Sequence, residues 1–503
     1  MEVYQIEQQF VEQKEMLKKI EEYARGLAMN KPLHEVERDL FGMMMRMGLS
    51  FIKEVVALHG DGKVGGKLVC EGGSELKFHD MRKRNYLSVF GPLEIVRAYY
   101  WGDGEQGICP LDAMLNLPQG QTSYFLEQWI LADVVEMPYD KALERLENIL
   151  QLPLWKGGHR VEAAHVAGNV DTFYQSKVAP PIETEGSVIC ATADCKGVRM
   201  VPSEKPEHAK PPAARLGKGE KTGLRKDAVV TSDFTFVPGQ REPEEMARRL
   251  MREQTAKEKD TERAARLMRK SNGEPEPRSP LNQQRSATMY GKQKSAADLA
   301  ARIAQRDPQE TKPICILIDG AHALKTTLFE EFKQRGWSER IDGVCLDIYH
   351  VMEYLWEAGT ALFGEKNPKR QEWVRDQTLA LLQGRVGYVI GALRHTLSKR
   401  GHKFKAHQKK SITNVITYFD NHRDMMRYDV FLEKGYPIGT GVIEGACGSL
   451  VKARMDGSGK RWTKQGAQAV LDLRAVQQNG DWNSFRKFYI SSEHNRLYHL
   501  IAA

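Results

Sequence analysis

Two short apolar runs that each end in an aspartate constrain the fold of this chain more than any other feature. The first run, 188–193, is followed by Asp194, and the second, 314–318, is followed by Asp319. A third acidic residue, Glu444, lies in a glycine-rich segment. Because a charge in an apolar setting needs a partner, these carboxylates indicate one shared cation site. The pattern predicts metal-dependent chemistry on a polynucleotide.

The order of elements between 181 and 366 predicts the fold around these residues. Strand-like segments cover 187–194, 197–201 and 227–237, and a strand, helix, strand, helix succession follows from Pro313. This is the order of an RNase H-like core, an α/β sheet that places acidic residues at its first and fourth strands. We therefore expect a multidomain α/β protein with an RNase H-like catalytic core.

Three polar or basic stretches are expected to be insertions in that core. Residues 203–225 and 243–312 are rich in charged side chains and predict loops, polar helices or disordered chain. Residues 367–435 are helical in pattern and form a third insertion. Six cations in twelve residues of this insertion favour phosphate binding over a plain solvated face. They are Lys399, Arg400, Lys403, Lys405, Lys409 and Lys410.

The first 180 residues predict helical and β-hairpin parts that bind DNA. Residues 1–60 have heptad-like apolar spacing, which fits a bundle helix or a short coiled coil. Residues 61–120 alternate as a hairpin does, and residues 121–180 contain short helices compatible with a helix-turn-helix. The candidate DNA contacts are Arg82, Lys83, Arg84 and Arg160. The alternative for the hairpin is that its basic residues only keep it soluble. The alternative for 121–180 is a plain helical connector.

Composition limits the class of protein. A chain of 503 residues is longer than one hydrophobic core usually fills. A net charge of +8 attracts polyanions but is weak evidence for nucleic acid by itself. Seven cysteines without CxxC spacing indicate reduced thiols, and no run is long enough to span a bilayer. These features predict a soluble cytoplasmic protein with no membrane partner.

The three carboxylates suit a two-metal mechanism. Two Mg²⁺ ions about 3.5–4 Å apart, for which Mn²⁺ can substitute, activate the attacking oxygen and stabilise the leaving oxygen. We expect Asp194 to bridge both ions, with Asp319 and Glu444 each holding one. The alternative is that these residues are ordinary helix caps, because the chain has 66 acidic residues and aspartate often caps a helix.

Two further features surround the predicted site. If Thr440 caps a helix, positions 448, 451 and 455 share the face of Glu444, with Lys452 and Arg454 flanking it as phosphate contacts. Asp347 and His350 are spaced i, i+3 where a strand meets a helix, so both can face the cleft. His350 could orient a water, and Asp347 could replace one metal ligand. A structural histidine is the alternative.

At these residues the chain resembles the DDE transposases of bacterial insertion sequences. The resemblance is greatest to the ISKra family, which is related to Mutator-type transposases. It covers about 187–485, and its most specific part is the block that includes Gly439-Thr-Gly-Val-Ile-Glu-Gly. The resemblance implies a catalytic triad of Asp194, Asp319 and Glu444, with Asp347 and His350 as a DxxH element. The other matching segments are 193–198, 317–324, 347–356, 452–455 and 459–462, the last of which contains Arg461, a further candidate DNA contact.

The resemblance also sets expectations for partners and cofactors. Family members often carry a CxxC pair upstream, but only Cys70 and Cys109 stand nearby here, too few for a tetrahedral zinc site. The expected partners are the terminal inverted repeats and target DNA, bound by a homodimer in a prokaryotic nucleoid. The catalytic glutamate helix and C-terminal helices would occupy 436–503. The alternative hypotheses are a structure-specific nuclease on the same fold and a DNA-binding protein that has lost catalysis.

Overall fold

The chain folds as two compact units, Met1–Ser176 with Gly480–Ala503, and Lys177–Asn479. The structure is a computed structural model that describes residues 10–70, 73–102, 107–154, 159–202, 224–457 and 460–499. The last residues of the chain rejoin the first unit, which the expected grouping of 436–503 did not anticipate. None of the helices in the described ranges combines the length and apolar character needed to cross a bilayer.

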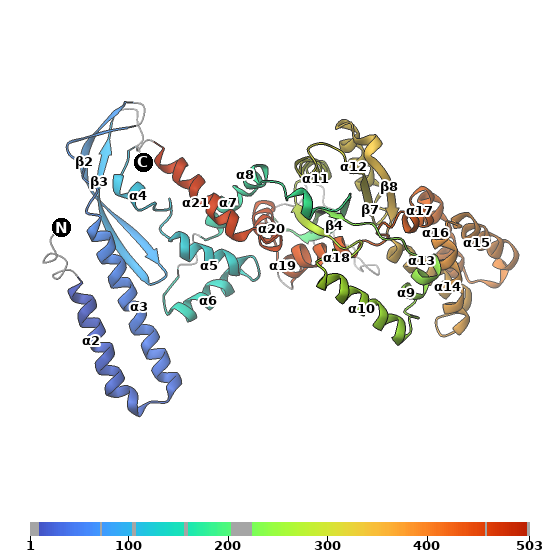
Figure 1. Cartoon of the computed structure of the whole chain (residues 1–503), viewed down its shortest axis with the longest axis horizontal. Coiled ribbons are helices and arrows are strands. Elements are labelled where there is room, and N and C mark those ends of the chain that lie inside the picture. Colours follow the sequence, from blue (N-terminus) through green and yellow to red (C-terminus); the bar gives the residue numbers. More distant parts are fainter. Residues whose placement is uncertain are drawn as a thin grey trace. The chain divides into compact units, whose positions relative to one another are not determined.

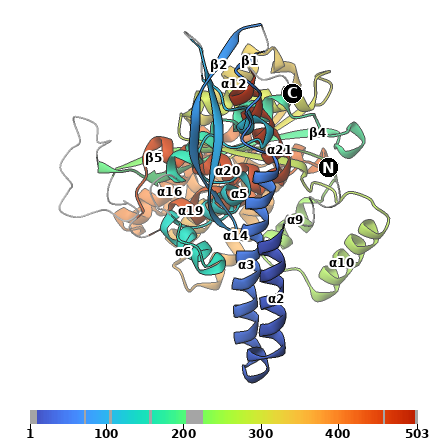
Figure 2. The same ribbon diagram turned by 90° about the vertical axis from the view of Figure 1, so that its left-hand side faces the viewer.

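The first unit begins with a helical hairpin. Helices α2 (Val11–Arg25) and α3 (Leu33–Leu58) lie side by side, joined through a 3₁₀ turn at Leu27–Asn30 (Figure 2). Gln13, buried between them, donates a hydrogen bond of 2.7 Å to the hydroxyl of Ser50. The predicted helical region is thus confirmed over the described residues, as a pair of helices.

A three-stranded antiparallel sheet follows, with β1 (Lys67–Val69), β2 (Glu75–Ser88) and β3 (Gly91–Trp101) in that order. The predicted hairpin is confirmed, because β2 and β3 pair from Lys77 with Trp101 to Ser88 with Gly91.

The C-terminal helix α21 (Trp482–Tyr498) packs against helices of this unit. The Arg486 guanidinium on α21 pairs with the buried Glu127 carboxylate at 2.8 Å, and Phe485 lies against Phe173 with ring centroids 5.5 Å apart. These contacts explain why the chain's end belongs to the first unit. The other helices are α4 (Pro110–Met114), α5 (Tyr124–Val134), α6 (Tyr139–Leu150), α7 (His159–Ala167) and α8 (Val170–Ser176).

The second unit is built on a five-stranded mixed sheet in the order β6-β5-β4-β7-β8. Figure 1 labels its strands β4, β7 and β8. The first three strands along the chain pair antiparallel, whereas β7 runs parallel to both β4 and β8. The central strands are almost wholly buried, as expected for apolar runs covered on both faces. The strands are β4 (Val188–Arg199), β5 (Arg225–Phe236), β6 (Leu281–Thr288), β7 (Ile314–Ile318) and β8 (Ile341–Leu346).

Two expectations for this sheet are corrected. The segments 187–194 and 197–201 were expected to be separate strands, but 188–199 is one continuous strand, paired with β5 along its whole length. The stretch 243–312, expected to be an insertion, instead supplies the edge strand β6 and the helix α11 (Lys292–Arg306). One face of α11 is buried in the core, including Leu299 and Ile303. Most of the other expected insertion, 203–225, lies outside the described residues.

Of that stretch, α10 (Ala256–Ser271) has no buried residue, whereas α9 (Pro243–Leu250) contributes Met246 and Ala247 to the core that contains the sheet. The region 367–435 is helical as predicted, but its helices α14 (Pro368–Leu382), α15 (Val386–Arg400), α16 (Ala406–Asn421) and α17 (Tyr428–Glu433) share one hydrophobic core with the sheet. The region is therefore an integral layer of the second unit. The remaining helices are α12 (His322–Gln334), α13 (Ile348–Phe363), α18 (Gly441–Ala446), α19 (Ala453–Met455) and α20 (Lys464–Gln478).

Candidate active site

Three aspartates lie in a row at the carboxyl edge of the parallel strands. Thr192 pairs with Leu317, so extending the β4–β7 register by two residues sets Asp194 opposite Asp319. Ile318 pairs with Leu346, and one further residue sets Asp319 opposite Asp347. Neighbouring strands are about 4.8 Å apart, and residues in register point to the same face. The carboxyl ends of parallel strands are where α/β sheets bind ligands.

Asp194 is held by contacts from three directions. Asp194 is 8% exposed, and its carboxylate accepts the backbone N–H of Cys195 at 2.6 Å. The Cys447 thiol donates to Oδ2 at 3.2 Å, and the Lys196 ammonium pairs with the same oxygen at 2.9 Å. Since alternate residues of a strand share a face, Lys196 stands beside Asp194 on β4. A cation therefore already neutralises this buried charge.

Asp319 lies in a turn that contacts α16 through a hydrogen bond from Tyr418. Its Oδ1 accepts the backbone N–H of Ala321 at 3.1 Å, and its carbonyl accepts the Tyr418 hydroxyl at 3.1 Å. His422 lies with Nε2 3.1 Å from the carbonyl of Gly320. Gly320 has φ of +94°, and a Cβ there would lie 2.7 Å from the Tyr418 hydroxyl, so only glycine fits. Helix α16 thus fixes the backbone that presents Asp319.

Asp347 has a positioning role in this structure. It is 1% exposed and accepts the Tyr349 N–H at 3.1 Å, which caps α13. It also accepts the Thr440 N–H at 3.2 Å and the Thr440 hydroxyl at 2.6 Å. Both carboxylate oxygens are therefore engaged in joining β8 to the segment that begins α18. The expectation that Asp347 could replace a metal ligand is not supported by these bonds.

Glu444 comes from α18, which contacts β4 and β5, and its side chain is exposed. Partial burial, then the Asp347 and Asp194 charges, raise the pKa of Glu444 above its ordinary value, while Lys196 acts in the opposite direction. Glu444 is therefore within electrostatic reach of the aspartate row.

The helix that carries Glu444 differs from the expected one in two ways. Thr440 makes no side-chain cap, because its hydroxyl binds Asp347. A π-helical turn, Cys447–Lys452, follows α18 and changes the spacing of side chains along the helix. The prediction that residues 444, 448, 451 and 455 share one helix face is therefore wrong. The residue of this segment that contacts Asp194 is the buried Cys447.

His350 lies on the first turn of α13, at the edge of this site. Its side chain is 37% exposed, with Nδ1 3.3 Å from the Glu353 carboxylate. Its ring stands edge-on to Tyr354 and Tyr418, with centroids 5.4 and 5.8 Å away. His350 thus borders the Asp319 turn through Tyr418.

Carboxylates outnumber cations at this site. Among the described residues, the Lys196 ammonium pairs with Asp194 and interacts electrostatically with Asp319 and Glu444. Although burial alone would lower it, the Asp194 carboxylate holds the pKa of Lys196 above its ordinary value, with smaller contributions from Cys447 and Asp319. Within the described ranges no three acidic, histidine or cysteine side chains are already gathered as a metal-binding group. The oxygen donors fit a hard divalent cation, which would have to displace Lys196 from Asp194.

The expected basic surface of 399–410 is present. All six of its cations are exposed, and they lie at the end of α15, in the turn Gly401–Lys403, and at the start of α16. Lys452 and Arg461 are also exposed. These eight cations are accessible to a polyanion.

Other expected DNA contacts have structural partners. Arg454 is 2% exposed and its guanidinium lies 4.7 Å from the Trp462 ring centroid. Arg84 has a side chain only 12% exposed that pairs with Asp112 at 3.0 Å. Burial removes both guanidinium groups from solvent, so their predicted DNA contacts are corrected to structural roles.

Three expected contacts remain in the first unit. Arg82 pairs with Asp80 at 3.0 Å and lies 3.3 Å from the Tyr99 ring centroid, and Lys83 pairs with Glu94 at 2.8 Å. Both stay exposed on the hairpin. Arg160 begins α7, but its side chain lies outside the part that the structure describes.

The sequence reasoning missed Lys196, Cys447, Tyr418 and His422. Lys196 could have been found, because a strand continued past Asp194 places residue 196 on the same face. Cys447, three residues after Glu444, is likewise on the same side of a helix. Tyr418 and His422 gave no signal, since their contact with Asp319 and Gly320 joins residues about a hundred positions apart.

Comparison with known proteins adds nothing to this geometry: no family model and no curated protein matches the chain.

Proposed function

We propose that this chain is a DNA transposase of the DDE type, which cuts and joins the ends of an insertion sequence in an RNase H-like catalytic unit. The observation that carries the proposal is that the register of the adjacent parallel strands β4 and β7, extended by two residues, sets Asp194 opposite Asp319, with Glu444 electrostatically coupled to Asp194 and Asp347. These strands are the first and fourth of the sheet along the chain. That is the arrangement expected of the family that the sequence resembles.

Asp194, Asp319 and Glu444 would hold the divalent metal ions, Mg²⁺ or Mn²⁺. When bound, two such ions supply an activated water or 3′-hydroxyl and a stabilised leaving oxygen. Their carboxylates are oxygen donors of the kind these cations prefer. The three carboxylates need not converge before the metal binds. Until then, the Lys196 ammonium neutralises Asp194, and the metal ion replaces it.

The remaining residues of the site position these three side chains. Asp347, through Thr440, fixes the start of the helix that carries Glu444. Tyr418 and His422 fix the backbone that presents Asp319. Once displaced, the Lys196 ammonium is free to contact a phosphate oxygen of the DNA strand. His350, half-exposed beside Tyr418, is available to the same strand.

The basic turn between α15 and α16 supports binding of double-stranded DNA. Six exposed cations within twelve residues attract phosphates and release counterions when bound. We assign the turn to the backbone of terminal-repeat or target DNA, and we place a homodimer of the chain on that DNA in the bacterial nucleoid.

The test is incubation with a plasmid that carries the sequences flanking the gene, in the presence of Mg²⁺. Wild-type protein is compared with Asp194→Asn, which removes a metal ligand with little change of shape. Joined products that need Asp194 support a transposase. Nicks without joining would make it a nuclease, and binding without either would make it a non-catalytic DNA-binding protein.

A further inference from the structure

A second pocket lies against the segment that leads to α18. Gly439 and Gly441 line it, whereas Thr440 between them faces Asp347. The exposed ring of Tyr349 forms part of the same wall. About 1280 Å³ of empty space, open to solvent, lies in this pocket. The segment 439–441 thus contacts both this pocket and, through Thr440, Asp347.

Four arginines line the pocket, which we call the arginine groove: Arg241, Arg249, Arg266 and Arg278. Only two glutamates, Glu262 and Glu276, line it with them. Glu262 is engaged with Arg249 at 2.9 Å and Glu276 with Arg269 at 2.9 Å. The groove is thus rich in cations whose neighbouring carboxylates are already paired.

Two of these arginines have no carboxylate partner within ion-pair distance among the described residues. Arg241 donates to the carbonyl of Tyr436, and Arg278 donates to the carbonyl of Gly239 at 2.5 Å. Burial, reinforced by the charges of Arg278 and Arg249, lowers the pKa of Arg241 to about 10. Burying two positive charges close together costs free energy unless an anion binds between them.

The backbone around the groove is built to hold these arginines in place. Gly435 has φ of +75°, and a Cβ there would lie 2.3 Å from the backbone nitrogen of Gly239. The two segments cross in direct contact, with the Gly239 N–H donating to the Gly435 carbonyl at 2.9 Å. This crossing sets Arg241 beside Tyr436. The groove is therefore preformed.

The floor of the groove is apolar. Phe234, Ile348 and Ile438 are buried beneath it, and Tyr349 is 52% exposed above them. A cationic rim with an exposed aromatic ring is the combination that binds single-stranded nucleic acid, with phosphates on the cations and bases on the ring. A duplex backbone alone would need only the cations.

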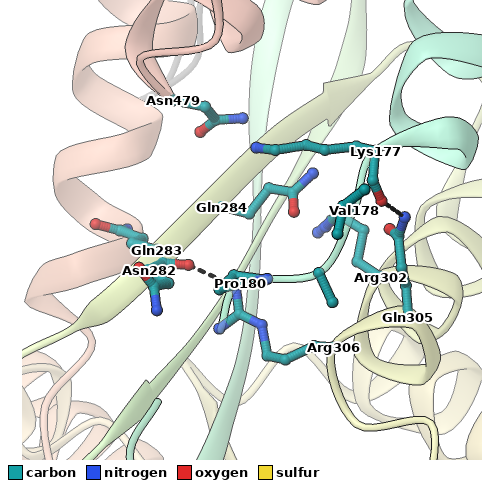
Figure 3. A pocket seen from close by; sticks show the side chains of 11 residues that line it. Lys177, Val178, Pro180, Asn282, Gln283, Gln284, Arg302, Gln305, Arg306 and Asn479 are labelled. Carbon is teal, nitrogen blue, oxygen red and sulfur yellow. Dashed lines mark hydrogen bonds between the residues drawn. The ribbon is translucent and has the colours of Figure 1, made fainter. Parts of the chain in front are cut away.

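Arg302 and Arg306 line a smaller pocket elsewhere in the same unit (Figure 3) and serve as a comparison. There Arg302 and Arg306 both pair with the Asp233 carboxylate, at 2.6 and 3.3 Å. Asp233 is fully buried, so those guanidinium charges are offset inside the fold. Among the described residues of the chain, no buried carboxylate pairs in this way with Arg241 or Arg278 of the arginine groove.

We propose that the arginine groove binds one unstacked nucleotide of the DNA strand that enters the candidate active site. Its phosphate lies against Arg241 and Arg278, and its base stacks on Tyr349. The inference rests on the proposed function for the identity of the strand. It adds a subsite that recognises unpaired DNA.

The experiment measures binding by fluorescence anisotropy, with EDTA present so that no cleavage occurs. The probes are a fluorescein-labelled duplex with the gene's flanking sequence and the same duplex with an unpaired flap. Tyr349→Ala and Arg278→Gln are compared with Arg263→Gln, whose exposed side chain on α10 does not line the groove. Circular dichroism and urea unfolding check folding, and Tyr349→Leu serves as a milder second variant.

The expected result is that Tyr349→Ala and Arg278→Gln each weaken binding of the flap probe by about tenfold. Binding of the plain duplex, and all binding by Arg263→Gln, stays at the wild-type level. The groove inference is overturned if the variants bind the flap probe as wild type does, or lose both probes equally. If the wild-type protein binds neither probe, the proposed function itself fails.

Discussion

Replacing Thr440 by valine tests the link between the aspartate row and the helix that carries Glu444. The substitution keeps the shape of a side chain that is 2% exposed and removes only the hydroxyl that donates to Asp347 at 2.6 Å. Oδ2 of Asp347, a residue 1% exposed, then loses that donor. A hydrogen bond to a charged acceptor is worth about 1.5–3 kcal/mol, and we expect the free energy of unfolding to fall by that amount.

The assay is urea unfolding followed by tryptophan fluorescence, with the transition of the Lys177–Asn479 unit fitted separately because the chain has two units. Thr327→Val is the matched control, since Thr327 is only half-buried and its hydroxyl donates to the helix carbonyl of Ala323 at 2.9 Å. We expect a change below about 0.5 kcal/mol for the control. Equal stability of Thr440→Val and wild type would refute the assigned bond and the positioning role of Asp347.

Three further predictions follow from the site and its surroundings. Lys196→Met should tighten Mn²⁺ binding about fivefold, because the ammonium no longer competes for Asp194, and calorimetry that finds weaker binding would contradict this. The double variant Lys403→Gln with Lys409→Gln should lower the salt slope of DNA binding by roughly 1.8, whereas Lys366→Gln, outside the basic turn, should leave it unchanged. Burial alone would raise the pKa of Glu493, but hydrogen bonds from Arg496 and His165 hold it below its usual 4.5. A depressed pKa contributes stability that is present above the ordinary value and is lost as pH falls through the folded value, so Glu493→Gln should flatten the loss of stability below about pH 4. An unchanged acid profile in thermal unfolding would show that Glu493 has no such role.

The strand β7 and most of β4 could be predicted because their signal is local. Continuous apolar runs such as 314–318 can only be buried strands or helices, and a short run that ends in an acidic residue indicates a strand edge. That Asp194 and Asp319 belong to one site stays a prediction, with which the register of β4 and β7 is consistent.

The edge strand β6 could not be predicted in the same way. Its sequence, Leu281-Asn-Gln-Gln-Arg-Ser-Ala-Thr, has little apolar character, because it lies at the sheet edge and is mostly half-buried. Side-chain amides of α20 and of the residue that follows it satisfy part of the backbone of β6: Gln468 donates to the carbonyl of Ala287 at 3.1 Å, and Asn479 accepts the N–H of Arg285 at 2.9 Å. These partners lie nearly two hundred residues away in sequence.

Buried charges are a second limit of sequence reasoning. Arg454 was expected to flank the face of Glu444 and to contact phosphates. In the fold its guanidinium lies against Trp462, which is itself 9% exposed. Whether a cation faces solvent depends on tertiary contacts of this kind, so only part of the expected DNA surface remained accessible.

The most direct test of the cation site is titration of the protein with Mn²⁺, monitored by electron paramagnetic resonance, for wild type, Asp194→Asn and Asp347→Asn. If Asp194 is a ligand and Asp347 a positioning residue, Asp194→Asn should weaken Mn²⁺ binding by about tenfold or more, and Asp347→Asn by clearly less. Wild-type affinity in Asp194→Asn would contradict the account.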